Sequence, residues 1–165
     1  MIDGFLALIT DPGFLASFGY IGVFLAGFLS TFSLFLPSPT FIAVFLLATT
    51  LNPLLLGIIG GLGAGVGELI GYGVGVGANK VLKRKYKKYI DWANELFEKY
   101  HPNVVIFVLA AAPVFPFDVA GIFCGTINYN IKHFSFYLIT GKILKYLILA
   151  YAGFFGLNFF MGLLG

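Results

Sequence analysis

The chain has few charged side chains, a single cysteine and two histidines. Only 10% of its 165 residues are charged, whereas a soluble domain usually has about 25%. Folded as a soluble globule, it could not cover its surface with polar groups. With 59% hydrophobic residues, it is expected to be an integral membrane protein. A soluble enzyme, a disordered tail and a nucleic-acid-binding domain are excluded, so no nucleic acid is expected among its partners.

The same scarcity limits the chemistry that the chain can perform. Cys124 is alone, so no disulfide framework is expected. No cluster of His, Cys and carboxylates has the spacing of a metal site. No Ser-His-Asp set or carboxylate pair supports hydrolysis, and the Gly-x-Gly patterns do not follow a strand, as a dinucleotide site would require. We therefore expect a protein that is not an enzyme and has no catalytic residues, metal or cofactor.

Positive charge is concentrated in one segment. Seven of the ten Lys and Arg fall between Lys80 and Lys99, and the positive-inside rule places such a loop in the cytoplasm. The spacing of apolar residues predicts one amphipathic helix over residues 80–100 at the cytoplasmic interface. Its apolar face would contain Val81, Tyr86, Ile90, Ala93, Leu96, Phe97 and Tyr100. Residues 1–12 are predicted to be a shorter interfacial segment.

Prolines interrupt two of the apolar runs. The first run stops at Pro37-Ser38-Pro39-Thr40, and about 12 residues of apolar helix then rise only about 18 Å, too short for a core of about 30 Å. A half-length segment behind a proline break predicts a re-entrant hairpin, here over residues 14–51. Pro113 and Pro116 break residues 104–128 in the same way. Residues 54–79 and 133–160 are each long enough to span the membrane.

The two halves of the chain repeat one order of features. Gly67-Glu68 with Tyr72 in the first long segment matches Gly141-Lys142 with Tyr146 in the second. Because the basic loop lies between the halves, the two hairpins would enter from opposite sides. The predicted fold is an all-α integral membrane protein of two inverted repeats, each a re-entrant helical hairpin followed by a transmembrane helix, with the amphipathic interfacial helix between them.

Four ionisable residues lie within apolar stretches: Glu68, Asp118, Lys142 and Lys145. A charge at the bilayer centre costs on the order of 3 kcal/mol or more, so each needs a reason to be there. Glu68, one turn before Tyr72, is either a proton-titrating or headgroup-contacting carboxylate, or half of a structural ion pair with Lys142. Asp118 is either a helix cap or a second carboxylate facing a cavity. Lys142 and Lys145 are candidate contacts for a lipid phosphate.

Small residues mark further candidate positions. Gly63, Gly67, Gly71 and Gly75 recur every four residues, which lets another helix approach closely, either within the chain or in a homodimer. Ser38 and Thr40 lie at the first proline break, where they either cap a helix or help a half-helix N-terminus hold an anion.

Three stretches of the chain resemble the DedA, or VTT-domain (SNARE-associated), membrane protein superfamily. They are Pro37-x-Pro39, Gly67-Glu68-x-x-Gly71-Tyr72-x-x-Gly75, and Pro113-x-x-Pro116-Phe117-Asp118-x-Ala120-Gly121 with Phe134 and Gly141-Lys142. The resemblance covers roughly residues 20–155. The stretch from Phe117 to Gly125, continued through Gly141-Lys142, is especially similar to a eukaryotic member, vacuole membrane protein 1.

The resemblance implies lipid transport. The leading expectation is a phospholipid scramblase in which headgroups cross through a polar cleft between the two hairpins, lined by Glu68, Asp118 and Lys142. The alternative is a flippase, coupled to H⁺ or Na⁺, for a polyprenyl-phosphate carrier. Membrane phospholipids or polyprenyl phosphate are thus the expected partners, and a homodimer is left open. The expected location is a prokaryotic plasma membrane, with the chain crossing it several times.

Overall fold

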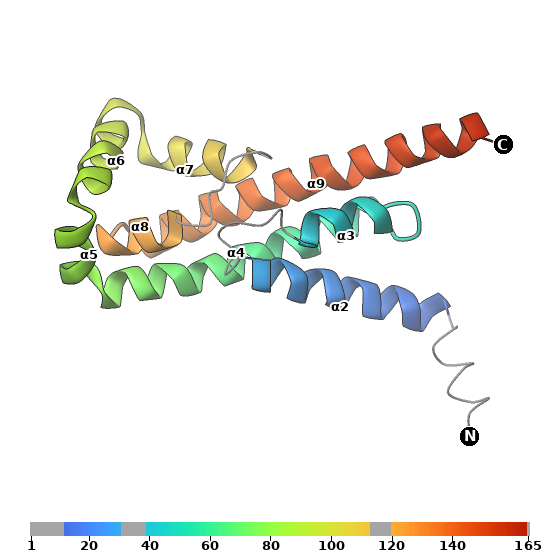
Figure 1. Cartoon of the computed structure of the whole chain (residues 1–165), viewed down its shortest axis with the longest axis horizontal. Coiled ribbons are helices and arrows are strands. Elements are labelled where there is room, and N and C mark those ends of the chain that lie inside the picture. Colours follow the sequence, from blue (N-terminus) through green and yellow to red (C-terminus); the bar gives the residue numbers. More distant parts are fainter. Residues whose placement is uncertain (1–11, 31–38, 113–119, 165) are drawn as a thin grey trace, which may run out of the picture.

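The computed structural model describes residues 12–30, 39–112 and 120–164, and every element within these ranges is a helix. Two helices are longer than the rest of those described (Figure 1). In chain order the helices are α2 (Pro12–Ser30), α3 (Pro39–Leu47), α4 (Pro53–Gly77), α5 (Asn79–Lys85), α6 (Lys87–Lys99), α7 (Pro102–Ala111), α8 (Ala120–Thr126) and α9 (Ile131–Leu164). The expected segment 1–12 lies almost entirely outside the described residues.

An asparagine begins each long helix. The side-chain oxygen of Asn52 accepts hydrogen bonds from the backbone N–H groups of Leu54 and Leu55, at 2.9 and 3.3 Å, and Pro53 occupies the first turn of α4. Asn130 accepts from Lys132 and His133 in the same way, at 3.0 and 3.4 Å. These caps satisfy N–H groups that a helix start leaves without partners. Local sequence therefore sets where α4 and α9 begin.

Both long helices can cross a membrane. Pro53–Gly77 and Ile131–Phe159 are long and apolar enough to do so, and a 25-residue helix rises about 38 Å. The outward face of α4 exposes large apolar side chains at four-residue spacing, and α9 exposes a similar set. These side chains are Leu62, Val66, Ile70 and Val74 on α4, and Phe136, Leu144, Ile148, Phe155 and Phe159 on α9. Lipid accommodates such a surface, whereas water disfavours it.

The two long helices run antiparallel and touch along glycines of α4. The pairs in contact are Gly57 with Leu147, Gly61 with Ile143, and Gly65 with Ile139. A Cβ atom added at Gly61 would lie 2.5 Å from the Cα atom of Ile143, a separation that real side chains do not adopt. Only glycine permits so close an approach of two backbones. This second set of glycines was not singled out from the sequence.

Four short helices pack along the two long ones. α2 runs parallel to α4 and covers its first half, where Phe24 meets Gly63. α8 covers the second half of α4, where Gly125 meets Tyr72. On α9, α7 covers the first half and α3 the second. Figure 1 shows α2 and α3 flanking one end of the molecule, and α7 and α8 flanking the other. Each long helix therefore changes its short partner partway along its length.

The predicted glycine stripe of α4 is covered by two short helices of the same chain. A Cβ atom at Gly63 would come within 3.0 Å of the Phe24 carbonyl oxygen of α2, and one at Gly75 equally close to the Ile122 carbonyl oxygen of α8. Gly71 also faces α8, and Gly67 is buried. The close approach expected at these positions is present, but the helices that make it belong to this chain rather than to a second copy.

The single amphipathic helix predicted over residues 80–100 is instead two helices, α5 and α6. They meet at Tyr86, whose φ of −115° and ψ of 28° leave the helical region. Because this break resets the helical periodicity, residues on its two sides no longer share a face. Ile90 and Ala93 on α6 are buried, whereas Val81, Tyr86 and Tyr100 are exposed, so the residues of the predicted apolar face do not share one environment in the protein.

Two glycines of α4 provide a matched test of this packing. Gly75→Ala should lower the free energy of unfolding by about 1–3 kcal/mol, because the new methyl group would push α8 away from α4. Gly73→Ala is the control, since a Cβ atom there meets nothing within 4 Å. The measurement is unfolding by SDS in mixed micelles, followed by circular dichroism. Equal stability of the two variants would contradict the packing described.

Candidate functional site

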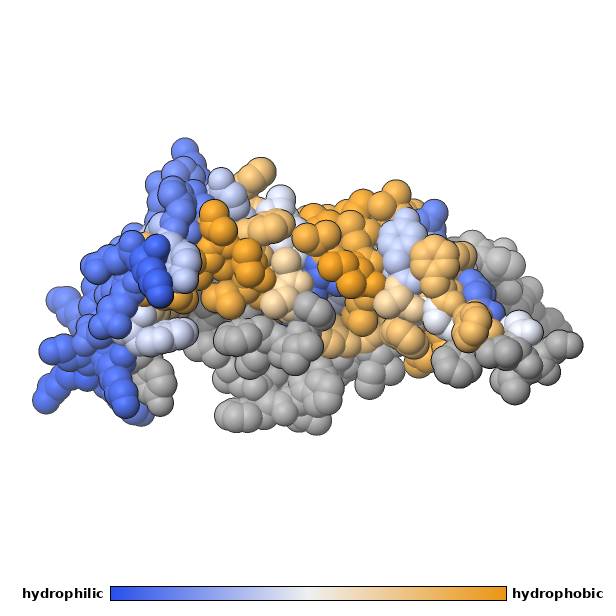
Figure 2. All heavy atoms as spheres, turned by 90° about the horizontal axis from the view of Figure 1, so that it is seen from above, coloured by the Kyte–Doolittle hydropathy of each residue, from blue (hydrophilic) through white to orange (hydrophobic). Residues whose placement is uncertain are grey.

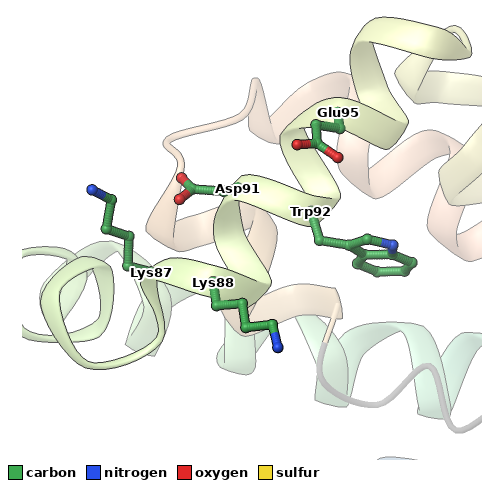
Figure 3. Close-up of a pocket in the computed structure, with 5 residues that line it drawn as sticks. All are labelled: Lys87, Lys88, Asp91, Trp92 and Glu95. Carbon is green, nitrogen blue, oxygen red and sulfur yellow. The ribbon is translucent and has the colours of Figure 1, made fainter.

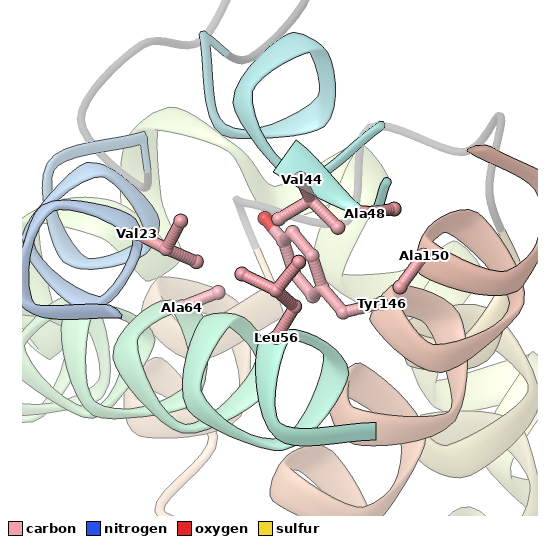
Figure 4. Close-up of a cluster of buried hydrophobic side chains, with 7 residues drawn as sticks. All are labelled: Val23, Val44, Ala48, Leu56, Ala64, Tyr146 and Ala150. Carbon is pink, nitrogen blue, oxygen red and sulfur yellow. The ribbon is translucent and has the colours of Figure 1, made fainter. Parts of the chain in front are cut away.

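Two buried apolar clusters fill the spaces between the helices. The first contains Tyr72, Ile106, Ala110, Cys124, Phe134 and Leu138. The second contains Val23, Val44, Ala48, Leu56, Ala64, Tyr146 and Ala150, drawn from α2, α3, α4 and α9 (Figure 4). In Figure 4 the ring of Tyr146 lies among the other members of the second cluster. Both clusters draw side chains from α4 and from α9, so each long helix passes through both.

A buried ion pair lies between the two clusters. The Nζ atom of Lys142 on α9 is 2.8 Å from Oε2 of Glu68 on α4, and the two side chains are 3% and 0% exposed. One turn from Glu68, Ala64 belongs to the second cluster and Tyr72 to the first. On α9, Lys142 lies one turn from Leu138 of the first cluster and one turn from Tyr146 of the second. The pair is therefore enclosed by apolar packing along both helices.

The other oxygen of Glu68 is directed to the first turn of α8. Oε1 accepts a hydrogen bond from the backbone N–H of Gly121, at 3.3 Å. A Cβ atom at Gly121 would collide with the Glu68 carbonyl oxygen, so glycine is required where α8 meets α4. A helix start favours negative charge, which suits a carboxylate at this point. Glu68 thus connects three helices: α4, α8 and, through Lys142, α9.

A second buried cation lies close to the ion pair on α9. Lys145 is 5% exposed, and its Nζ atom lies 4.8 Å from the centroid of the Phe41 ring in the first turns of α3. The Phe41 ring also meets Tyr146 edge to face, at 5.7 Å. A cation above an aromatic face is stabilised by the ring's quadrupole, most strongly where water is excluded. The beginning of α3 thus contacts Lys145, as the beginning of α8 contacts Glu68.

Tyr72 holds α8 and α9 in place relative to α4. Its hydroxyl group donates a hydrogen bond to the carbonyl oxygen of Tyr129, in the connection between α8 and α9. Its ring stacks on Phe134 of α9, with centroids 5.3 Å apart. The Tyr129 hydroxyl group donates in turn to Oδ1 of Asn103 on α7, at 2.5 Å. Tyr72 is thus part of a polar chain that leads away from the ion pair.

The structure brings Glu68 and Lys142 together, with Tyr72 one turn away on α4 and Lys145 about one turn away on α9. Pro39 and Thr40 begin α3. The other predicted tip residues, Pro37, Ser38, Pro113 and Pro116, lie outside the described residues, as does Asp118. The ion pair considered for Glu68 is present, and its two side chains are buried, so they do not line an open polar cleft.

Sequence reasoning missed several residues of the site. Phe41 had no distinguishing signal, since it is one of 20 phenylalanines in the chain. Gly121 was noted only within a family motif and without a role, and Gly125 was not singled out. The two are four residues apart, which is the spacing that lets helices approach closely.

Membrane-length helices with outward apolar faces and a buried ion pair are consistent with a helical membrane protein. The chain belongs to the VTT-domain family: the family model of the VTT domain matches residues 36–155, a range that includes the four site residues described. Proteins of this DedA/SNARE-associated family are generally membrane proteins linked to lipid transport. No curated protein and no solved structure matches the chain. The closer similarity to vacuole membrane protein 1 stays a prediction.

The ion pair makes a prediction about stability. Glu68→Leu should cost about 3–5 kcal/mol in the free energy of unfolding, because it leaves Lys142 buried without this counter-charge. The double variant Glu68→Leu with Lys142→Leu should recover most of that loss, since apolar residues of similar volume can replace a buried ion pair. Unfolding by SDS in mixed micelles measures both. A double variant no more stable than the single one would contradict a direct interaction.

Proposed function

We propose that the protein is a phospholipid scramblase in which headgroups cross the bilayer at the level of Glu68 and Lys142. The observation that supports this most is the buried 2.8 Å ion pair between two apolar clusters. Charges in that position are costly, and membrane proteins keep them mainly where polar solutes pass. In this proposal the lipid tails remain in the bilayer while the headgroup exchanges interactions with the pair.

The depth of Glu68 fits this role. It lies fifteen residues after the start of α4 and nine before its end, which corresponds to about 22 Å and about 13 Å along the helix. Because the hydrocarbon core is about 30 Å thick, such a position is deep within it. This is where a phosphate headgroup meets its largest barrier, so polar groups there reduce the barrier most.

We further propose that the chain is built of two inverted repeats, each a re-entrant hairpin followed by a long helix. Glu68 and Lys142 have matching places in the two halves, after Gly67 and Gly141. Residues related by a two-fold axis can touch each other only near that axis, and these two are in contact. α4 packs first against α2 and then against α8, and α9 packs first against α7 and then against α3. A two-fold axis that relates the two halves would produce this arrangement.

The short helices are the elements we expect to move. Where α8 lies on α4, glycines on both helices bring the backbones together. Parting the two helices would separate Cys124 and Phe123 of α8 from the first cluster. Parting would break the bond from Gly121 to Glu68 and expose the carboxylate. The closed ion pair is then the resting state, and separation of α8 from α4 opens the path.

The test is scrambling of fluorescent phospholipids in proteoliposomes, followed by dithionite bleaching. The wild-type protein should allow dithionite to bleach lipid from both leaflets without any ion gradient. Glu68→Leu with Lys142→Leu should slow scrambling by at least about tenfold, because it removes polar groups from the deepest part of the path. This double variant is chosen because it is expected to remain folded.

Gly73→Ala is the matched control for this assay, since it alters α4 without meeting any neighbouring atom. It should scramble lipid at the wild-type rate. Bleaching by the wild-type protein that stops at the outer leaflet, as in empty vesicles, would exclude the scramblase. A wild-type rate in the double variant would exclude the proposed path.

A second candidate is a flippase, coupled to H⁺ or Na⁺, for a polyprenyl-phosphate carrier. The buried carboxylate of Glu68 beside Lys142 favours it, because protonation of such a group can couple transport to a proton gradient. This candidate predicts net movement of a polyprenyl phosphate only under a gradient, and its loss in Glu68→Gln. Scrambling that is equally fast with and without a gradient supports the first proposal.

A further inference from the structure

The helix α5 concentrates positive charge in one turn and a half. Four of its seven residues are basic and none is acidic: Lys80, Lys83, Arg84 and Lys85 are all exposed. The following helix α6 has three basic and three acidic residues, so its charges balance. The excess charge of the basic segment therefore belongs to α5 and not to the segment as a whole.

Three of these cations surround a shallow hollow. The hollow has a volume of about 570 Å³ and is lined by Lys80, Val81, Arg84 and Lys85. Lys80 and Arg84 are four residues apart on the helix, as are Val81 and Lys85, so both pairs lie on adjoining strips of one face. Val81 is an apolar residue among the cations and is 67% exposed. This combination suits a ligand with an anionic group and an apolar part.

The position of α5 decides which ligand of that kind it meets. α4 is long enough to cross the membrane and ends at Gly77. α5 begins two residues later. Figure 2 shows hydrophilic side chains gathered over the end of the molecule with α5 and α6, next to a mainly hydrophobic length. The hollow thus lies where lipid headgroups lie. Phospholipid phosphates are the anions most concentrated there.

The neighbouring helix α6 offers an interfacial anchor. Trp92 is 60% exposed, although a large aromatic side chain in water would favour burial. Figure 3 shows Lys88 and Trp92 directed to the same side of α6, while Lys87 points away from them. Tryptophan is enriched at the boundary between headgroups and acyl chains, and lysine reaches from there to the phosphates.

From these observations we infer that α5 is a docking site for anionic phospholipids. Lys80, Arg84 and Lys85 bind the phosphate, Val81 contacts the apolar part of the lipid, and Trp92 on α6 lies at the headgroup boundary. The inference does not depend on lipid scrambling, because it concerns the end of the molecule and not the ion pair of Glu68.

The test compares two triple variants of the full-length protein. Purified, delipidated protein is incubated with equal amounts of phosphatidylglycerol and phosphatidylcholine of the same chain length, and bound lipids are counted by native mass spectrometry. The wild-type protein should retain phosphatidylglycerol preferentially. Because each basic side chain near an anionic surface favours binding by roughly fivefold, K80Q/R84Q/K85Q should reduce this preference at least about fivefold.

The matched control is K83Q/K87Q/K99Q, which removes the same charge from positions outside the hollow and leaves Lys88 in place. It should keep most of the preference, because Lys80, Arg84 and Lys85 remain. Equal losses in the two triple variants would mean that only diffuse charge attracts the lipid, and would overturn the site. So would an unchanged preference in K80Q/R84Q/K85Q, or displacement of the lipid by inorganic phosphate at equal concentration. Emission from Trp92, the only tryptophan of the chain, checks that α6 is undisturbed in both variants.

Fluorescence of Trp92 also tests how deeply this residue lies in the bilayer. In vesicles, lipids brominated near the headgroup should quench Trp92 more strongly than lipids brominated near the chain ends. Equal or stronger quenching by the deeper label, or no quenching by either, would overturn the placement of Trp92 at the headgroup boundary.

Discussion

The close contact between α4 and α9 is the constraint on which the rest of the structure depends. Gly57, Gly61 and Gly65 let the two backbones approach, so the two long helices form one unit. In a bilayer, apolar side chains gain little by leaving lipid for protein, and close packing provides much of the association energy instead. The four short helices can then use the remaining faces of α4 and α9 as their platform.

The buried ion pair follows from that contact. With the helices so close, Glu68 and Lys142 can meet across the interface, and Gly121 supplies a further hydrogen bond to Glu68. Moving both charges into a low-dielectric environment costs several kcal/mol, which their attraction offsets only with good geometry. An ion pair of this kind is a weak source of stability, and the proposed passage of headgroups at this level would give it a function.

Charge is found at two levels of the molecule. The deep pair of Glu68 and Lys142 is shielded by the apolar clusters, whereas the cations of α5 are exposed at one end of the long helices. Both proposals assign a phospholipid headgroup to these levels, because its phosphate can interact with cations at the surface and at depth. The two sites are separable, since one depends on helix packing and the other on charge density along α5.

The sequence by itself determined the class of protein, the two long helices and the residues that had to be explained within them. Hydrophobicity and length suffice for this because lipid demands uniform apolar segments, and an ionisable residue within such a segment is conspicuous. Local chemistry also set the starts of α4 and α9, through Asn52 and Asn130. Only the tertiary structure decided which glycines face which helix, that α5 and α6 separate at Tyr86, and that Phe41 lies beneath Lys145. Those outcomes depend on contacts between residues far apart in the chain, or on one backbone break, and helical periodicity contains no information about either.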